Sequence, residues 1–159
     1  MLFLLFQLGQ DRYALDTSRV AEVLPLVDIT QLPQAPPGVA GLFNYRGVPV
    51  PVIDLSQLTM GRPAQSRLNT RIVLVHYPDG SGGTRLLGLI AEKVTETVRR
   101  DKSDFVASGV TNDRVPYLGP VATDARGLVR WIDVEKLLPA AVRDVLFAPP
   151  ENADGPPRL

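Results

Sequence analysis

Proline is the residue that most limits how this chain can fold. The 159 residues include 15 prolines, roughly twice the average usage of about 5%. Many of them separate short apolar runs, at positions 25, 33, 36, 37, 49, 51, 78, 116 and 120. Because proline has no N–H and clashes inside a helix, long helices are excluded from most of the chain. The runs between the prolines are rich in Val, Ile, Leu and aromatic residues, which is typical of strands.

Four pairs of these runs flank turn signals and predict hairpins. The pairs are 2–8 with 12–16, 39–44 with 48–55, 70–77 with 84–91, and 115–123 with 128–132. Alternating stretches at 19–28 and 94–100 add two further strands, which makes about ten. A helix is expected only at Asp133–Leu146, with Asp133 as its N-cap and Pro139 interrupting it. This pattern predicts a mainly β fold, either a barrel or a sandwich.

Composition excludes several classes of protein. The chain has no cysteine, which rules out disulfides and thiolate metal sites and fits a reducing cytoplasm. Equal numbers of acidic and basic residues, 17 each, argue against a nucleic-acid partner and against binding to anionic lipid. The apolar start Met1–Phe6 is too short to insert in a membrane and predicts a buried strand. Residues 1–147 are expected to form a single domain, followed by a disordered tail at 148–159.

An internal repeat relates the two halves of the chain. Arg46-Gly47 followed by Ile53-Asp54 reappears about 80 residues later as Arg126-Gly127 followed by Ile132-Asp133. Upstream of these, Val20-Ala21-Glu22 is matched by Val94-Thr95-Glu96. An ordered set of matches of this kind predicts two similar β-subdomains that pack together.

Residues that could support catalysis are few. His76 is the only histidine and ends an apolar run, where a structural role is common. Gly80–Gly83 lacks the strand-to-helix context of a phosphate-binding loop and is interpreted as a hairpin turn. Asp54 and Asp133 precede short helical turns and can cap them, although a hydrolase using this carboxylate pair is a possible alternative. We therefore predict a protein that is not an enzyme and needs no metal or cofactor.

The segment from Phe3 to Leu55 resembles the CheW family of chemotaxis coupling proteins. The resemblance rests on the order and spacing of several motifs in this segment. They are FLLFQLG at 3–9, YALD at 13–16, VAEV at 20–23, LPQAP at 32–36, GVAGLFNYRG at 38–47 and VPVIDL at 50–55. The second half matches more loosely, at 87–94 and 129–138, so that the resemblance covers about residues 2–140.

The resemblance implies a fold of two intertwined SH3-like, five-stranded β-barrels with a short C-terminal helix. It also implies a non-catalytic cytoplasmic adaptor in chemosensory signal transduction, associated with arrays of membrane-bound receptors. The expected partners are the cytoplasmic tip of a methyl-accepting chemoreceptor and the regulatory domain of a CheA-type histidine kinase. The alternatives are a CheW-like regulatory module of a kinase or hybrid coupling protein, or a β-barrel enzyme.

Six residues are expected to bind partners, four of them by their match to the family and two by their place in the same turn. Arg46 corresponds to the arginine associated with receptor binding, within the turn that also contains Asn44 and Tyr45. The other three are Val20, Glu22 and Gly41, at positions associated with receptor or kinase contact.

A groove for a helical receptor tip needs an apolar floor, for which Val20, Val39, Leu42 and Phe43 are candidates. Arg46, Gly41 and Gly47 also have purely structural alternatives. Arg46 would be a turn residue that bonds its neighbours, and the two glycines would be positions that require positive φ. The sequence departs from the family at Tyr45, where leucine is usual, and at Lys102–Asn112, which follows no family pattern. These departures suggest an accessory, non-flagellar pathway.

Overall fold

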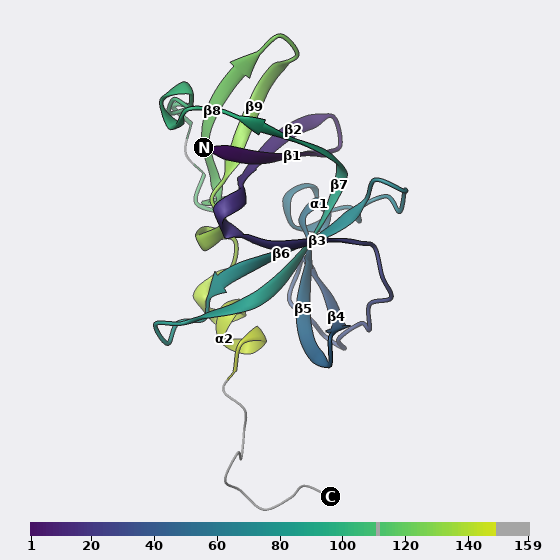
Figure 1. Cartoon of the computed structure of the whole chain (residues 1–159). Helices are drawn as coiled ribbons and strands as arrows, with labels where there is room; N and C mark the ends of the chain where they lie inside the picture. Colours follow the sequence, from purple (N-terminus) through teal and green to yellow (C-terminus); the bar gives the residue numbers. More distant parts are fainter. Residues whose placement is uncertain (111, 149–159) are drawn as a thin grey trace, which may run out of the picture.

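The computed structural model describes residues 1–110 and 112–148 of the chain, which form nine strands and two short α-helices (Figure 1). The strands are β1 Leu2–Leu8, β2 Asp11–Asp16, β3 Val20–Pro25, β4 Val39–Tyr45, β5 Val48–Asp54, β6 Arg71–Pro78, β7 Thr84–Arg99, β8 Leu118–Asp124 and β9 Gly127–Ile132. The helices are α1 Leu55–Met60 and α2 Ala140–Leu146. Single 3-10 turns lie at Thr17–Arg19, Lys102–Asp104 and Val134–Lys136. The fold is therefore mainly β, as the short apolar runs predict.

The strands make two five-stranded halves that share β7. Sheet one has the order β7-β1-β2-β9-β8 and uses the end of β7, whereas sheet two has the order β3-β6-β7-β5-β4 and uses its beginning. Each sheet contains one parallel pair, β2 with β9 and β5 with β7. In Figure 1, sheet one lies at the top and sheet two at the bottom, with β7 running between them. The hairpin β1–β2 continues into β3 of the other sheet, so the chain exchanges strands between the two halves.

The continuity of β7 corrects one expectation. The sequence predicts separate strands at 84–91 and 94–100, but Thr84–Arg99 is one strand. Lys93, with φ of 49°, produces an irregularity there, and the pairing with β1 slips between Gln7↔Glu92 and Leu5↔Glu96. A bulge of this kind bends a strand without ending it, so a single strand can serve both sheets.

Each sheet is closed into a barrel by one isolated β-bridge. In sheet two, the segment after β3 bridges to β4 through Thr30 and Leu42. In sheet one, the segment after β7 bridges to β8 through Val106 and Val121. Val106, which lies in the region that follows no family pattern, thus contributes the closing bridge of sheet one. The two sheets have equivalent strand orders and equivalent closures, as the sequence repeat predicts.

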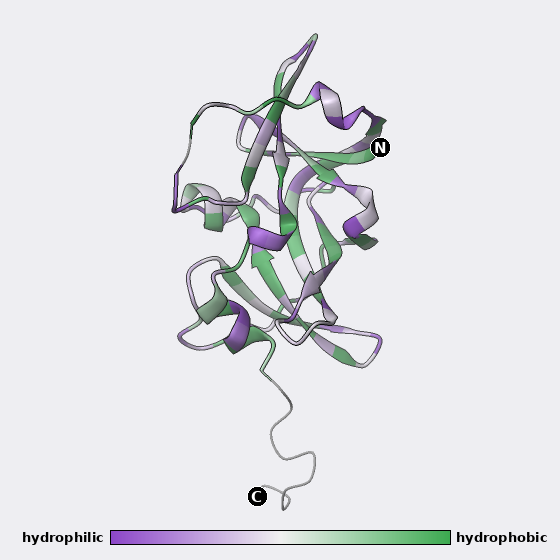
Figure 2. Cartoon of the chain, turned by 90° about the vertical axis from the view of Figure 1, so that its left-hand side faces the viewer, coloured by the Kyte–Doolittle hydropathy of each residue, from purple (hydrophilic) through white to green (hydrophobic). Residues whose placement is uncertain are grey.

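Three groups of buried side chains hold this arrangement together. The largest group lies between the two sheets and includes Phe6, Leu15, Ile53, Val75 and Leu137. Each sheet also has a smaller core of its own, in sheet one around Phe3 and in sheet two around Phe43. Figure 2 shows hydrophobic segments along the strands through the middle of the molecule and hydrophilic ones at turns and helices. Burial of the shared group removes the apolar faces of both halves from water together.

The C-terminal region differs in detail from its prediction. In place of one helix over 133–146, the structure has a 3-10 turn at Val134–Lys136 and then α2, with Pro139 at the N-cap position. Asp133 makes no side-chain capping hydrogen bond, and its carboxylate lies 3.7 Å from the Lys136 ammonium. The expected capping role is therefore wrong for Asp133. Most of the tail predicted to be disordered, from residue 149 onward, lies outside the described residues.

Candidate functional site

The turn between β4 and β5 is a two-residue hairpin loop built on Arg46 and Gly47. Both residues have positive φ, 52° and 86°, and they connect the paired residues Tyr45 and Val48. Two consecutive positive φ values are the signature of a type I′ turn, whose twist matches that of the strands. The Asn44 side-chain Oδ1 accepts a hydrogen bond of 2.7 Å from the Gly47 N–H. The backbone requirement inferred for Gly47 is confirmed, and the left-handed conformation of Arg46 itself was not foreseen.

Three of the six predicted site residues meet beside this turn. The Tyr45 hydroxyl donates a hydrogen bond to the Glu22 carboxylate, and this bond is the main cause that raises the pKa of Tyr45. The Arg46 guanidinium lies 3.6 Å from the same carboxylate and 4.9 Å from the centre of the Tyr45 ring. The Arg46 side chain is 75% exposed, so most of its N–H groups are open to a partner. We call Glu22, Tyr45 and Arg46 the docking cluster.

The remaining predicted residues support the docking cluster from β3 and β4. Val20 and Glu22 lie on the same, half-buried face of β3 because side chains alternate along a strand. Gly41 is buried, with φ of 146°, and a Cβ atom there would lie 2.1 Å from the Thr30 carbonyl oxygen. Gly41 therefore serves the closure of sheet two rather than presenting a side chain to a partner.

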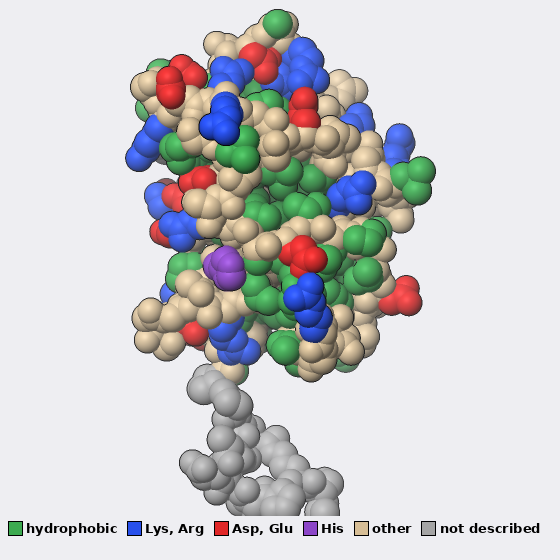
Figure 3. Space-filling model, viewed as in Figure 1, with side chains coloured by type: hydrophobic (Ala, Val, Ile, Leu, Met, Phe, Trp, Pro, Cys, Tyr) green, Lys and Arg blue, Asp and Glu red, His purple; other side chains and the backbone are tan. Residues whose placement is uncertain are grey.

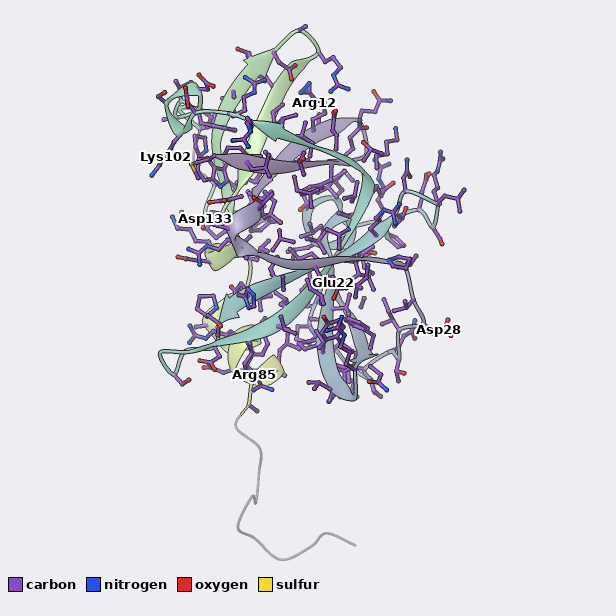
Figure 4. All side chains as sticks on the ribbon, viewed as in Figure 1. Arg12, Glu22, Asp28, Arg85, Lys102 and Asp133 are labelled. Carbon is purple, nitrogen blue, oxygen red and sulfur yellow. The ribbon has the colours of Figure 1, made fainter. Side chains whose placement is uncertain are left out.

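An apolar patch lies next to the docking cluster. Figure 3 shows hydrophobic side chains gathered in the middle of this face, with an acidic and a basic side chain just below them. Figure 4 places Glu22 at β3, close to the β4–β5 hairpin. Val20 is half-buried against the shared core, whereas Phe43, at 5% exposure, packs inside sheet two. The expectation that Phe43 supplies part of the groove floor is therefore wrong.

The second Arg-Gly turn, between β8 and β9, has a different charge environment. Arg126 pairs with Glu96 at 2.8 Å, in the same relation as Arg46 with Glu22. Asp124, which stands where the first turn has Asn44, also binds two arginines from other strands. Arg12 binds it with both terminal nitrogens, and the Arg100 guanidinium lies 3.3 Å from it. This network was missed by sequence reasoning because Arg12 lies 112 residues from Asp124 in the chain.

The other polar residues singled out in the sequence have structural environments. Asp54 caps α1 as predicted, accepting from the Gln57 N–H at 3.2 Å and from the Ala64 N–H at 2.9 Å. His76 is exposed on β6. Within residues 1–110 and 112–148, no three His, Asp or Glu side chains are grouped so that they could hold a metal ion. In the same residues, no helix has the length and apolar character needed to cross a membrane.

Comparison with known proteins places this geometry in a family. The chain is 26% identical to the chemotaxis protein CheW of Klebsiella aerogenes over 142 residues, covering 86% of this chain and 80% of that protein. It is 27% identical to protein FrzA of Myxococcus xanthus, covering 87% and 86% of the two chains. The crystal structure of the scaffolding protein TtCheW from Thermoanaerobacter tengcongensis superimposes with a TM-score of 0.76 at 26% identity, over 89% of each chain.

These likenesses confirm the predicted fold of two SH3-like barrels with a short C-terminal helix. The family model for the CheW-like domain matches residues 2–142, which is nearly all of the described chain. The chain therefore belongs to the CheW-like domain family.

Proposed function

We propose that this protein is a non-catalytic adaptor that couples methyl-accepting chemoreceptors to a CheA-type histidine kinase in chemosensory signalling. Several relatives that span most of the chain are named chemotaxis protein CheW, and the similar crystal structure is named a scaffolding protein. Two barrels in one rigid core suit a bridge, because each barrel offers a separate surface while the shared core fixes their spacing. In this role residues 1–147 act as one unit at the cytoplasmic tips of receptor arrays.

The observation that carries the proposal is the docking cluster beside the apolar patch. An α-helical receptor tip needs an apolar surface for its buried face and polar groups at the rim. Val20 contributes to the apolar surface, and Arg46 offers a planar, charged fork to carboxylates or carbonyls at the end of a helix. Tyr45 and Glu22 hold the arginine on one side, which lowers the entropy that it loses on binding.

The six predicted partner-binding residues divide into two roles in this proposal. Arg46, Tyr45, Glu22 and Val20 contact the partner directly. Asn44 and Gly41 act through the backbone, the first by closing the turn and the second by allowing β4 to approach Thr30. The kinase regulatory domain is the second partner, and the opposite barrel leaves a separate surface for it.

The test is direct binding to two purified partners, a receptor-tip helical hairpin and the regulatory domain of the kinase. We expect wild-type protein to bind both, and Glu22→Gln to weaken binding to the receptor tip while the unfolding curve stays unchanged. Rim charge pairs are screened by salt, so the receptor affinity should also fall between low and physiological ionic strength. Binding to neither partner would contradict the adaptor function.

A control separates the docking cluster from the general surface. Glu135→Gln removes an exposed carboxylate that pairs with Arg19, away from the β4–β5 turn. This variant should bind the receptor tip as wild type does. Equal losses in Glu22→Gln and Glu135→Gln would indicate a nonspecific charge effect and would remove the basis for the site.

A further inference from the structure

A polar cavity lies on the molecule, separate from the docking cluster. Its volume is about 220 Å³, and none of the residues that line it belongs to that cluster. Four segments form its walls: the β1–β2 turn at Gly9-Gln10, the start of α1, the loop at 62–67 and the irregularity of β7 at Glu92-Lys93. The cavity therefore lies where the two halves of the fold meet.

Three basic side chains line this cavity, Arg62, Arg67 and Lys93. Within the described part of the chain, none of the three has a carboxylate within 4.0 Å. Arg67 donates to the Gln65 Oε1 at 2.6 Å, and the nearest polar contact of Arg62 is the Met60 sulfur at 3.8 Å.

The charge balance of the cavity favours an anion. Glu92 is the one carboxylate among its lining residues, which leaves two net positive charges at neutral pH. The two guanidinium groups each carry five N–H donors, most of which are not used by the bonds described above. Like charges gathered in one hollow raise its positive potential, so a dianion is the ligand that it would attract most strongly.

Ser56 gives an independent indication that the cavity lacks a partner. It lines the cavity and is 1% exposed, yet its hydroxyl has no hydrogen-bond partner among the described residues. The large majority of buried polar side-chain atoms in proteins have at least one partner. A ligand oxygen, reached by a small rotation of the serine side chain, would supply it.

The walls of the cavity are preformed. Two hydrogen bonds fix the loop at 62–67. The Asp54 carboxylate accepts from the Ala64 N–H at 2.9 Å, and the Thr70 hydroxyl donates to the Gln65 carbonyl. Lys93 is held at φ of 49°, a conformation that non-glycine residues adopt at a cost and that is concentrated at functional sites. At Gly9, an added Cβ would lie 3.1 Å from the Arg62 guanidinium, so glycine leaves room for that group.

We propose that this cavity binds a phosphate group, either as inorganic phosphate or diphosphate or as the phosphate end of a nucleotide. A guanidinium binds phosphate through two parallel hydrogen bonds, and a lysine adds a point charge. At about 30 Å³ per water molecule, the cavity has room for a phosphate or diphosphate with a few waters. A phosphate dianion would also neutralise the two net charges.

Calorimetric titration of the full chain with phosphate and with diphosphate, at constant ionic strength set by sodium chloride, tests the proposal. We expect saturable one-to-one binding, weakened about tenfold or more by Arg62→Gln and by Arg67→Gln. Lys93→Asn should also weaken it, and asparagine tolerates the positive φ. Arg114→Gln, which alters an exposed arginine outside the cavity, should leave the affinity unchanged.

The source of the phosphate is distinguished by a parallel titration with a nucleoside diphosphate. Tighter binding than free diphosphate would indicate a nucleotide, and equal binding would indicate a site for the phosphate alone. The absence of saturable binding for all three ligands would overturn the proposal, as would equal affinities in the Arg62→Gln, Arg67→Gln and Arg114→Gln variants. Because no receptor or kinase is present, the result does not depend on the adaptor function.

Discussion

The two Arg-Gly turns share a sequence motif but differ in backbone and in what surrounds the arginine. Arg46 and Gly47 form the loop between the paired residues Tyr45 and Val48, whereas in the second turn Asp124 pairs with Gly127 and the loop is Ala125-Arg126. Each turn places its arginine beside a glutamate on a neighbouring strand, Arg46 by Glu22 and Arg126 by Glu96. At the second turn, the preceding acidic residue is Asp124, which collects Arg12 and Arg100 into a partly buried network. At the first turn, Asn44 only closes the loop, and Tyr45 joins the cluster instead.

A repeated sequence element can take two roles in one fold. A carboxylate with two arginines satisfies most of its hydrogen-bonding capacity internally, which favours stability of the barrel. An arginine at 75% exposure, 3.6 Å from a single carboxylate, contributes little to stability and keeps its donors for another molecule. We therefore interpret the second turn as mainly structural and the first as the docking surface.

The largest effect is expected at Gly41. Gly41→Ala would place a Cβ 2.1 Å from the Thr30 carbonyl oxygen at φ of 146°, so the closing bridge of sheet two must move. We expect a loss of about 3 kcal/mol in the free energy of unfolding, measured with urea. The matched change in sheet one is Gly119→Ala, where the added Cβ would be 3.0 Å from the Trp131 carbonyl oxygen and φ is ordinary. Equal losses in the two variants would contradict this reading of Gly41.

The next effect is expected at Asp124. Asp124→Asn removes the charge that balances Arg12, whose side chain is only 11% exposed, and should cost about 2 kcal/mol in urea unfolding. Asn44→Ala at the corresponding position of the first turn removes one hydrogen bond to Gly47 and should cost about 1 kcal/mol. If the Asn44 variant proved the less stable of the two, the second turn would not be the structural one.

A smaller effect concerns the titration of Tyr45. Its hydrogen bond to Glu22 raises the pKa of the phenol, so Tyr45 should remain protonated above pH 10, where a free tyrosine is half ionised. The stabilisation from this bond is present below pH 10 and is lost as the pH rises through the raised pKa. Absorbance titration at 295 nm, with Tyr45→Phe subtracted to isolate the signal, measures this pKa. Glu22→Gln should bring it back toward 10, and an unchanged value would show that Glu22 is not the cause.

Local sequence signals predicted the parts of the fold that depend on neighbouring residues. The Tyr45–Val48 hairpin, the alternating face of β3 and the capping role of Asp54 all follow from residues close together in the chain. The short apolar runs also predicted the mainly β class, because prolines exclude helices at known positions.

Features that depend on distant residues could not be read from the sequence. Lys93 looks like a break between two strands, and only pairing with both β1 and β6 shows that β7 continues through it. The ion-pair network of Asp124 could not be predicted because its partners Arg12 and Arg100 lie far from it in the sequence. The predicted sites at Arg46, Val20, Glu22 and Gly41 likewise came from family resemblance. The structure adds that Glu22, Tyr45 and Arg46 meet while Gly41 is buried.

We propose that the first Arg-Gly turn binds the receptor and that the second does not. The direct test compares Arg46→Ala with Arg126→Ala in binding to a purified receptor-tip hairpin, with urea unfolding of both variants measured in parallel. We predict that Arg46→Ala weakens receptor binding about tenfold or more and changes unfolding by less than about 1 kcal/mol, whereas Arg126→Ala binds as wild type does. Receptor affinity that is unchanged in Arg46→Ala, or reduced equally in both variants, would contradict the claim.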